Sequence, residues 1–150
     1  MQTHPNPASA EAPVSREARL AAYRAETLSR YPLPQQEAAL RLYHLAKRHL
    51  GTGGGNAAAK LLIGLYNGTR FPFDLTDLRR FDPANFEAAM IVLRMDACQT
   101  WCEIHVLLDA IRGPHANTGA EFENWAYDLK LRGRCKKEAL PQMPTDLLPA

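Results

Sequence analysis

Residues 67–83 constrain the fold more than any other part of the chain, because turn residues, helix-start signals and aromatic anchors fall within seventeen positions. Phenylalanine has no polar group to expose to water, so its rings here are expected to pack into a core and to fix how two layers of helices meet. Asp82 and Pro83 then form a helix cap followed by a first-turn proline, which predicts a long helix directly behind the segment. The phenylalanine residues that supply the aromatic anchors of this segment are Phe71, Phe73 and Phe81.

Similar start and stop signals divide the rest of the chain into helices. A capping residue or a proline precedes each series of apolar residues that repeats every three or four positions, and proline or glycine follows it. Thr118 and Glu121 have the spacing of a capping box, in which two side chains satisfy the first N–H groups of a helix. The signals predict helices over residues 15–30, 34–50, 56–67 and 118–132, a short turn from Asp74 or Thr76, and helical residues between 83 and 112.

Residues 83–112 are predicted either as one bent helix or as two helices. Thr100 and Glu103 have the pattern of a capping box, which favours a second helix start, but no residue from 96 to 99 forces a break. In the first half of this range, four apolar residues follow a helical spacing and are predicted to face inward. They are Phe86, Met90, Leu93 and Ala97.

The expected fold is all-α, a compact single-domain bundle of six or seven helices. No segment of five or six residues alternates apolar and polar side chains, so no strand is predicted. At 150 residues the chain is long enough to bury one core without disulfides or metal. Three parts are expected: a flexible proline-rich arm over residues 1–14, a helical domain over 15–138 and an irregular tail over 139–150.

Charge, apolar runs and cysteine content argue against several classes of function. A formal net charge of +2 is too small to indicate nucleic acid or an anionic membrane by itself. No apolar run approaches the roughly 18 residues of a membrane span, and residues 1–13 lack the pattern of a secretory signal. Three cysteines are an odd number, so a disulfide framework is not expected. A cytoplasmic protein without membrane contact is predicted.

Residues 51–60 raise the question of anion binding. Four glycines lead into a helix, and the free N–H groups at a helix N-terminus attract anions. A phosphate-binding loop, however, follows a strand and ends in Gly-Lys-Ser/Thr, whereas here the preceding segment is helical and Lys60 lies a full turn inside the next helix. The stretch from Gly51 to Asn56 is therefore interpreted as a flexible connection between two helices, with anion binding left open.

Three residues raise the question of a metal site. Cys98, Cys102 and His105 share one helix face if the helix is continuous through Thr100, and Cys135 offers a fourth ligand. Four cysteine and histidine ligands are typical of structural zinc, but the close cysteine pairs of most such sites are absent, and cysteine is also a common core residue. A zinc-binding helical domain is the weakest of three binding hypotheses, and no cofactor is expected.

The helix predicted over residues 34–50 carries cations on one face. Arg41, His44 and Arg48 follow a helical spacing opposite an apolar stripe. Two interpretations stay open: a solvated face, which is the commoner case, or one wall of a basic patch.

The strongest run of charge lies near the C-terminus, where five cations and no anion occupy eight positions. Such a run can neutralise phosphates or contact an acidic protein surface. It also suits a helix end, because cations there complement the helix dipole. Trp125 is expected in the core, whereas Tyr127 is a candidate for an exposed ring beside the cations. The run consists of Lys130, Arg132, Arg134, Lys136 and Lys137.

Residues 61–97 resemble a family of small uncharacterised all-helical bacterial proteins carried on plasmids, phages and integrative conjugative elements. The likeness rests on LLIGLYNGTRFPFDLTDLRRFD at residues 61–82 and on VLRMDA at residues 92–97. It covers about a quarter of the chain. The resemblance implies a setting, a mobile element inside a bacterial cell, and carries over no catalytic residue.

The leading hypothesis is a non-enzymatic accessory protein of a mobile element that binds another protein, as an adaptor or as an inhibitor of a host factor such as one of host defence. Its surface is expected to combine the cations near 130–137 with exposed rings such as Tyr127 and Phe71. The partner is expected to be a host or element-encoded protein, and a homodimer is left open. The second hypothesis is a DNA- or RNA-binding protein that uses the same cations with Arg41 and Arg48. No nucleophile and acid–base set is found, so no enzyme is predicted.

Overall fold

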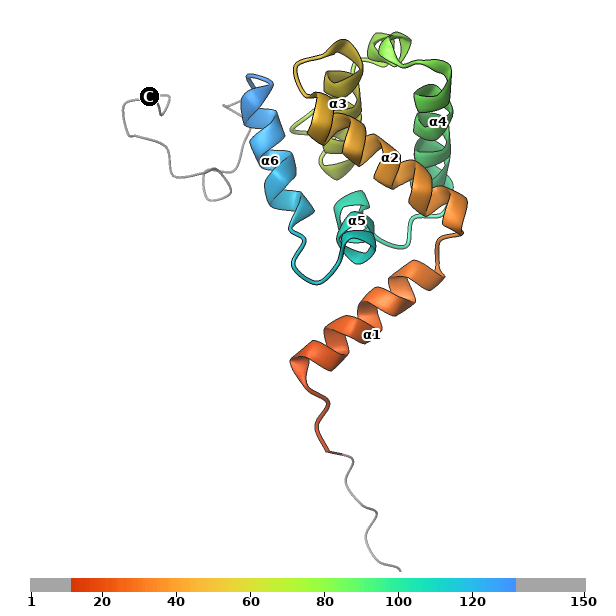
Figure 1. Ribbon diagram of the computed structural model, residues 1–150, viewed down its shortest axis with the longest axis vertical. Helices are drawn as coiled ribbons and strands as arrows, with labels where there is room; N and C mark the ends of the chain where they lie inside the picture. The colour runs from red at the N-terminus through yellow and green to blue at the C-terminus, as the bar shows by residue number, and fades with distance from the viewer. Residues whose placement is uncertain (1–11, 132–150) are drawn as a thin grey trace, which may run out of the picture.

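The computed structural model describes residues 12–131, and these residues form helices and connecting segments without a strand. The predicted all-α fold of six or seven helices is confirmed. Most of the arm predicted over residues 1–14 and the whole tail predicted over 139–150 lie outside the described residues. The elements are α1 (Arg16–Ser29), α2 (Leu33–His49), α3 (Gly53–Tyr66), the 3-10 helix η1 (Leu75–Arg80), α4 (Pro83–Cys98), α5 (Ile104–Arg112) and α6 (Thr118–Asp128) (Figure 1).

The core is built around α2 and α3. Helix α2 packs against α3, α4 and α5, and α3 also packs against α6. Figure 1 shows α2 crossing the front of the body, with α4 and α6 standing at its two sides and α5 below. Many buried residues of α2 and α3 are alanines, whose small side chains let helices approach closely. The inner face of α2 is thus buried in the core, whereas Lys47 and Arg48 on its outer face are exposed.

Helix α1 lies to one side of this body and makes its main packing contact with α5 (Figure 1). Tyr31 anchors the turn after α1, because its hydroxyl oxygen accepts the backbone N–H groups of Trp101 and Cys102 at 3.2 and 3.1 Å. Thr27 of α1 is fully buried, whereas Leu20 and other apolar residues on that helix stay largely exposed. Much of the apolar surface of α1 is therefore uncovered.

Three helix starts form as the sequence predicts. Ser15, Asp74 and Asp82 are the N-caps of α1, η1 and α4. Each side-chain oxygen accepts a backbone N–H two or three positions further along the chain, which satisfies a donor that has no partner inside the helix.

Helix α3 begins earlier than predicted. Thr52, not Asn56, is its N-cap, and its hydroxyl oxygen accepts the Gly55 N–H at 3.1 Å. Glycine normally disfavours a helix, but a Cβ on Gly55 would lie 1.9 Å from the carbonyl oxygen of His49. The interpretation of residues 51–56 as a flexible connection is wrong: three of the glycines form the first turn of α3 and let it touch the end of α2.

Residues 83–112 form two helices, which settles the alternative left open above. Helix α4 ends at Cys98, where the Thr100 hydroxyl donates a hydrogen bond to the carbonyl oxygen of Asp96. The predicted capping box does not form, because Glu103 is the N-cap of α5 and Thr100 belongs to the end of α4.

The start of α6 differs from the prediction by one residue. Asn117 is the N-cap, and its side chain accepts the N–H of a residue three positions later. Thr118 instead donates its backbone N–H and its hydroxyl to Asp109 Oδ1 at 2.8 and 2.6 Å. Glu121, which a capping box would direct back to the helix start, bonds to residues of α2 and α5.

Helix α4 is turned relative to the predicted orientation. Phe86, predicted to face inward, is 37% exposed, and Ala97 is exposed as well. Met90 and Leu93 are half-buried against the core. The inward face of α4 carries two alanines, and their small side chains allow α4 to lie close to α2. The buried residues of α4 are Ala88, Ala89, Val92 and Met95.

The rings of residues 67–83 pack as expected. Phe71 is 2% exposed, and Phe73 and Phe81 are half-buried against the same core. The prediction that these rings fill a core is confirmed. The separate expectation that Phe71 is an exposed ring of a binding surface is wrong.

Candidate functional site

The basic run predicted near the C-terminus lies mostly beyond the described residues. Arg132, Arg134, Lys136 and Lys137 fall outside them, and so does Cys135. Lys130 is exposed, at a position where the backbone leaves α6 with a φ of 64°. The role of the run stays a prediction.

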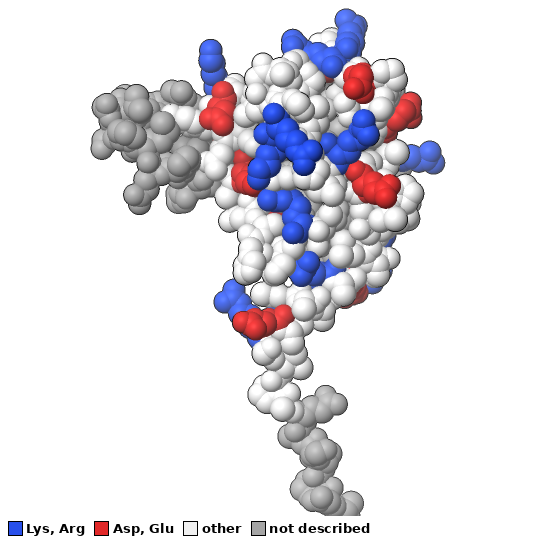
Figure 2. Space-filling model, viewed as in Figure 1, with Lys and Arg blue, Asp and Glu red and all other residues white. Residues whose placement is uncertain are grey.

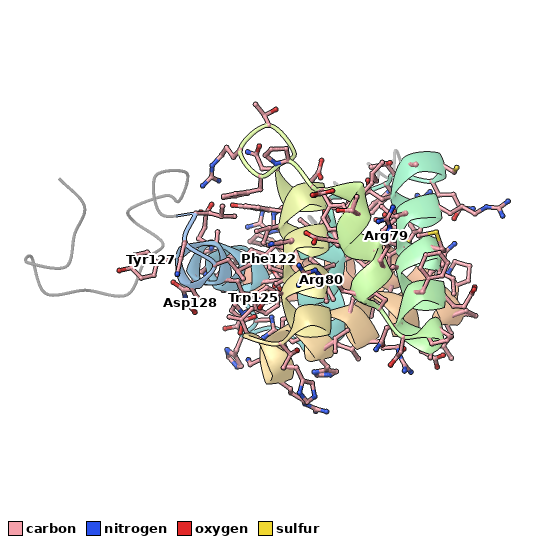
Figure 3. All side chains as sticks on the ribbon, turned by 90° about the horizontal axis from the view of Figure 1, so that it is seen from above. Arg79, Arg80, Phe122, Trp125, Tyr127 and Asp128 are labelled. Carbon is pink, nitrogen blue, oxygen red and sulfur yellow. The ribbon has the colours of Figure 1, made fainter. Side chains whose placement is uncertain are left out.

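Tyr127 is not the exposed ring that the sequence analysis expected. The residue is 7% exposed. Figure 3 shows Phe122 and Trp125 on one side of α6 and the Tyr127 ring on the other. Trp125 joins the core as predicted.

The three candidate zinc ligands lie on different segments. Cys98 is the exposed last residue of α4, Cys102 lies in the following loop beside the Tyr31 hydroxyl at 3.6 Å, and His105 belongs to α5, edge-on to Tyr66. The continuous helix that the hypothesis requires is absent. Within residues 12–131 no group of three or more His, Cys, Asp and Glu side chains is placed to hold a metal ion.

A groove of about 630 Å³ lies between α1 and the end of α5, and we call it the α1–α5 groove. Its α1 wall carries Leu20, Ala21 and Tyr23, beside the charged Glu17 and Arg24. The opposite wall is built by α5 and the loop that follows it: Val106, Asp109, Ala110, Gly113, Pro114, His115 and Ala116.

Local interactions explain how the walls of the α1–α5 groove are held. Arg24 Nη2 donates a hydrogen bond to the carbonyl oxygen of Ala110 at 3.3 Å, which ties α1 to α5. Gly113 has a φ of +119°, a conformation that favours glycine, and it turns the chain out of α5. Asp109 then holds the far end of the loop through its two bonds to Thr118.

A second depression, of about 500 Å³, lies between the outer face of α2 and the end of α5, and we call it the α2–α5 hollow. Figure 2 shows Lys and Arg side chains gathered over α2 at the centre of this face, with Asp and Glu around them. The hollow is lined by Leu40, Tyr43, His44, Lys47, Arg48, Ile111 and Arg112.

A polar network joins three helices beside the α2–α5 hollow. Glu121 of α6 accepts hydrogen bonds from the Tyr43 hydroxyl at 2.7 Å, from Lys47 Nζ at 3.0 Å and from Arg112 Nη1 at 2.6 Å. The Arg112 guanidinium also lies 4.2 Å from the centre of the Tyr43 ring and donates to the Thr118 hydroxyl oxygen at 2.8 Å. The position of Arg112 is therefore fixed on three sides.

The pKa values of this network follow from burial and charge. Burial alone would raise the pKa of Glu121, but hydrogen bonds from Tyr43 and Lys47 and the charge of Arg112 together lower it. Burial and the charges of Arg48, Arg112 and Lys47 lower the pKa of His44. The hollow is thus lined by cations and by an imidazole that favours its neutral form, and a carboxylate lies beside it.

The structure brings together part of the predicted site. Arg48 and His44 line the α2–α5 hollow as the basic-patch interpretation expected, while Arg41 lies on the same helix and donates its Nε–H to Asn85 Oδ1 at 2.7 Å. Sequence reasoning missed Lys47, Arg112 and Glu121 as members of this site. Lys47 follows His44 by three positions, which was a usable signal; the other two come from distant helices.

A buried ion pair elsewhere has a structural role. Arg70 donates to both carboxylate oxygens of Glu123 at 2.6 and 2.7 Å, and the Tyr66 hydroxyl donates to the same group at 3.1 Å. Glu123 is 1% exposed. The contact ties the loop after α3 to α6.

Comparison with known proteins places the chain in a family. No curated protein and no solved structure matches it. None of the helices within residues 12–131 has the length and apolar character to cross a bilayer. A family model matches residues 36–125, which include every residue of the α2–α5 hollow and one wall of the α1–α5 groove but not α1. The chain therefore belongs to DUF7673, a family of unknown function.

Proposed function

We propose that this chain is a non-enzymatic protein-interaction module that holds an apolar segment of a partner protein in the α1–α5 groove. The observation that carries the proposal is the uncovered apolar face of α1. Leu20 and Tyr23 line the groove and yet are 53% and 47% exposed, and Val14 just before α1 is 61% exposed. Apolar side chains exposed next to one another, with polar groups around them, are typical of protein interfaces.

The shape and chemistry of the groove suit a segment of protein chain. Its α1 wall runs from Glu17 to Arg24, which is about two helical turns. An amphipathic helix can place apolar side chains along such a wall at the same spacing. The lining charges have both signs, so Glu17 and Arg24 can each pair with an opposite charge at the edge of the bound segment. The carboxylates in the wall of the α1–α5 groove repel phosphate groups, so nucleic acid is disfavoured as the occupant of the groove.

The resemblance over residues 61–97 adds a setting to the proposal. We extend it to an accessory protein of a mobile element in the bacterial cytoplasm, which binds a host or element-encoded protein as an adaptor or an inhibitor. This extension rests on the resemblance alone, whereas the groove supports the binding role.

Two neighbouring alanines of α1 give a matched test. Both are exposed, but Ala21 lines the α1–α5 groove and Ala22 does not. Aspartate costs a similar amount of helix propensity at either position, so a difference between the variants reports on the groove. We expect Ala21→Asp to lose the partner that the tagged wild-type chain recovers from its own cells, and Ala22→Asp to retain it.

Circular dichroism and thermal unfolding establish that both variants are folded. Retention of the same partner by Ala21→Asp, or its loss from both variants, would contradict the proposal. Light scattering over a range of protein concentrations tests whether the partner in the groove is a second copy of the chain. If the purified wild type is a dimer and Ala21→Asp is a monomer, the occupant of the groove is the second copy.

A further inference from the structure

The α2–α5 hollow has no part in the proposed groove, and it gathers more positive charge than its own carboxylate neutralises. Lys47, Arg48 and Arg112 line it, and Glu121 is the one carboxylate among the described residues that bonds to any of them. Two positive charges are therefore left without a partner charge inside the site.

Two of the cations are already held in place. The Arg112 side chain is 18% exposed and is fixed by the Tyr43 ring, Thr118 and Glu121. Lys47 Nζ donates to the Tyr43 hydroxyl oxygen at 3.1 Å and to Glu121, which leaves one of its three N–H groups for a ligand. Groups that are ordered before binding lose little conformational freedom when a ligand arrives, so they favour affinity.

The third cation and the apolar lining complete the site. Arg48 is exposed, and among the described residues its side chain makes no hydrogen bond or ion pair, so its planar guanidinium can donate two parallel bonds to an anion. Leu40 and Ile111 supply apolar surface beside the cations. The volume of about 500 Å³ falls within the usual range for small-ligand sites.

We propose that the α2–α5 hollow binds a small phosphate monoester, with its phosphate among Arg48, Lys47 and Arg112 and its apolar body against Leu40 and Ile111. A phosphate monoester carries about −1.5 to −2 charges at neutral pH, which matches the two uncompensated cations. A carboxylate or sulfonate carries one negative charge and leaves one cation unpaired.

This inference is independent of the protein-binding groove. No residue of the α2–α5 hollow lines the α1–α5 groove. Ala21→Asp is therefore expected to leave phosphate binding unchanged. Either proposal can fail without the other.

Isothermal titration calorimetry with two ligands of similar shape tests the charge argument. Phenyl phosphate is expected to bind saturably at one site per chain. Benzenesulfonate has the same ring and one negative charge, and it is expected to bind at least about tenfold more weakly, a difference of about 1.4 kcal/mol.

Variants of opposite predicted effect separate binding from folding damage. Arg48→Gln is expected to weaken phenyl phosphate binding about tenfold, because charge-assisted hydrogen bonds are lost. Glu121→Gln is expected to strengthen it severalfold, since a competing carboxylate is removed. Arg94→Gln changes an exposed arginine of α4 that lies outside the hollow, and it is expected to have no effect.

The pKa of His44 gives a second measurement of binding, and a purely structural effect of a variant would leave its response to the ligand unchanged. In the free protein, burial and the charges of Arg48, Arg112 and Lys47 lower the pKa of His44. The ring also lies edge-on to Tyr43, whose hydroxyl bonds to Glu121. A bound phosphate offsets the repulsion by the cations, so the pKa of His44, followed by NMR, is expected to rise when phenyl phosphate is added.

Several results would overturn the inference. These are the absence of saturable binding, equal affinity for benzenesulfonate, and unchanged affinity in Arg48→Gln. Binding to a short DNA duplex but not to phenyl phosphate, with steep salt dependence and loss in Arg41→Gln, would also overturn it and would assign the cations of α2 to backbone phosphates.

Discussion

Glu121 links three helices through one carboxylate. It lies on α6, and its partners Tyr43 and Lys47 lie on α2 while Arg112 lies on α5. Its side chain is 27% exposed, so its hydrogen bonds are only partly screened by water. A charge at this position stabilises the packing of α6 and also limits the positive charge of the hollow.

The stability of the protein is predicted to depend on the charge of Glu121. Its pKa is lowered in the folded state, so its contribution is present above about pH 4.5, the ordinary value, and is lost as pH falls through the folded-state pKa. Glu121→Gln is expected to lower the free energy of unfolding by about 1–2 kcal/mol at neutral pH. It should also flatten the fall in stability at acid pH. Urea unfolding at a series of pH values measures both effects.

Glu26→Gln is the matched control for Glu121→Gln. Glu26 pairs with Arg30 on the exposed side of α1, where both side chains are about half exposed. Its replacement is expected to change stability by less than about 0.5 kcal/mol. A pH profile for Glu121→Gln that runs parallel to that of the wild type would show that the network does not stabilise the charged form.

Any side chain at Gly55 is predicted to disturb the contact between α2 and α3 and to lower the stability of the protein. A Cβ added there would lie 1.9 Å from the His49 carbonyl oxygen, whereas one added at Gly53 would meet nothing closer than Arg80 Nη1 at 3.7 Å. Gly55→Ala should therefore lower the free energy of unfolding by about 1–3 kcal/mol. Gly53→Ala should leave it unchanged or raise it slightly, because alanine favours a helix. Equal stability of the two variants in urea would refute the steric account.

Single residues of the α2–α5 hollow were predictable only where they share a helix. His44 and Arg48 follow one helical face, so their grouping could be read from spacing alone, whereas Arg41 of the same predicted face does not line the hollow. Arg112 and Glu121 reach the same place through the packing of α5 and α6 against α2, and no local pattern encodes that packing. Tyr127 shows the reverse error, since its nearness to cations in sequence suggested exposure and the structure buries it.

At the scale of elements, Tyr31 controls how α4 is joined to α5. Its hydroxyl oxygen accepts the N–H groups of Trp101 and Cys102, which belong to the loop between these helices. The Tyr23 ring and the Arg30 guanidinium also contact Trp101, at 5.7 and 5.4 Å from the ring centre. The turn after α1 and the loop before α5 therefore form one joint.

Tyr31→Phe is predicted to loosen that joint. The change keeps the ring, which is 4% exposed, but leaves two backbone N–H groups without their acceptor. The expected loss of stability is about 1–3 kcal/mol. Amide hydrogen exchange should accelerate at Trp101 and Cys102 more than at the centre of α2. Unchanged protection of these two amides would show that the hydroxyl does not hold the loop.

Helix positions were mostly predictable, and the errors have tertiary causes. Polar residues before α1, η1 and α4 cap them as local chemistry requires. The start of α3 was missed because glycines are poor helix formers, and only the close approach of His49 makes Gly55 the suitable residue. The face of α4 was misread because its alanines, rather than its largest apolar residues, pack inward.

At the scale of the whole molecule, the two proposed sites differ in how they relate to the family. The matched range of residues 36–125 contains the complete α2–α5 hollow, whereas the α1 wall of the groove precedes it. The two sites also differ in chemistry: one is apolar with mixed charge, and the other is basic. The α2–α6 body thus carries the proposed charged site, and α1 completes the proposed apolar one.

Site-specific photo-crosslinking in living cells tests the central claim most directly. A photoreactive phenylalanine analogue would replace Leu20 in the α1–α5 groove, and Ala22 and Arg94 outside it. The account predicts one discrete protein adduct from position 20, identified by mass spectrometry, and none from the other two positions. The absence of an adduct from position 20, or the same adduct from all three positions, would contradict the claim that this groove binds a protein partner.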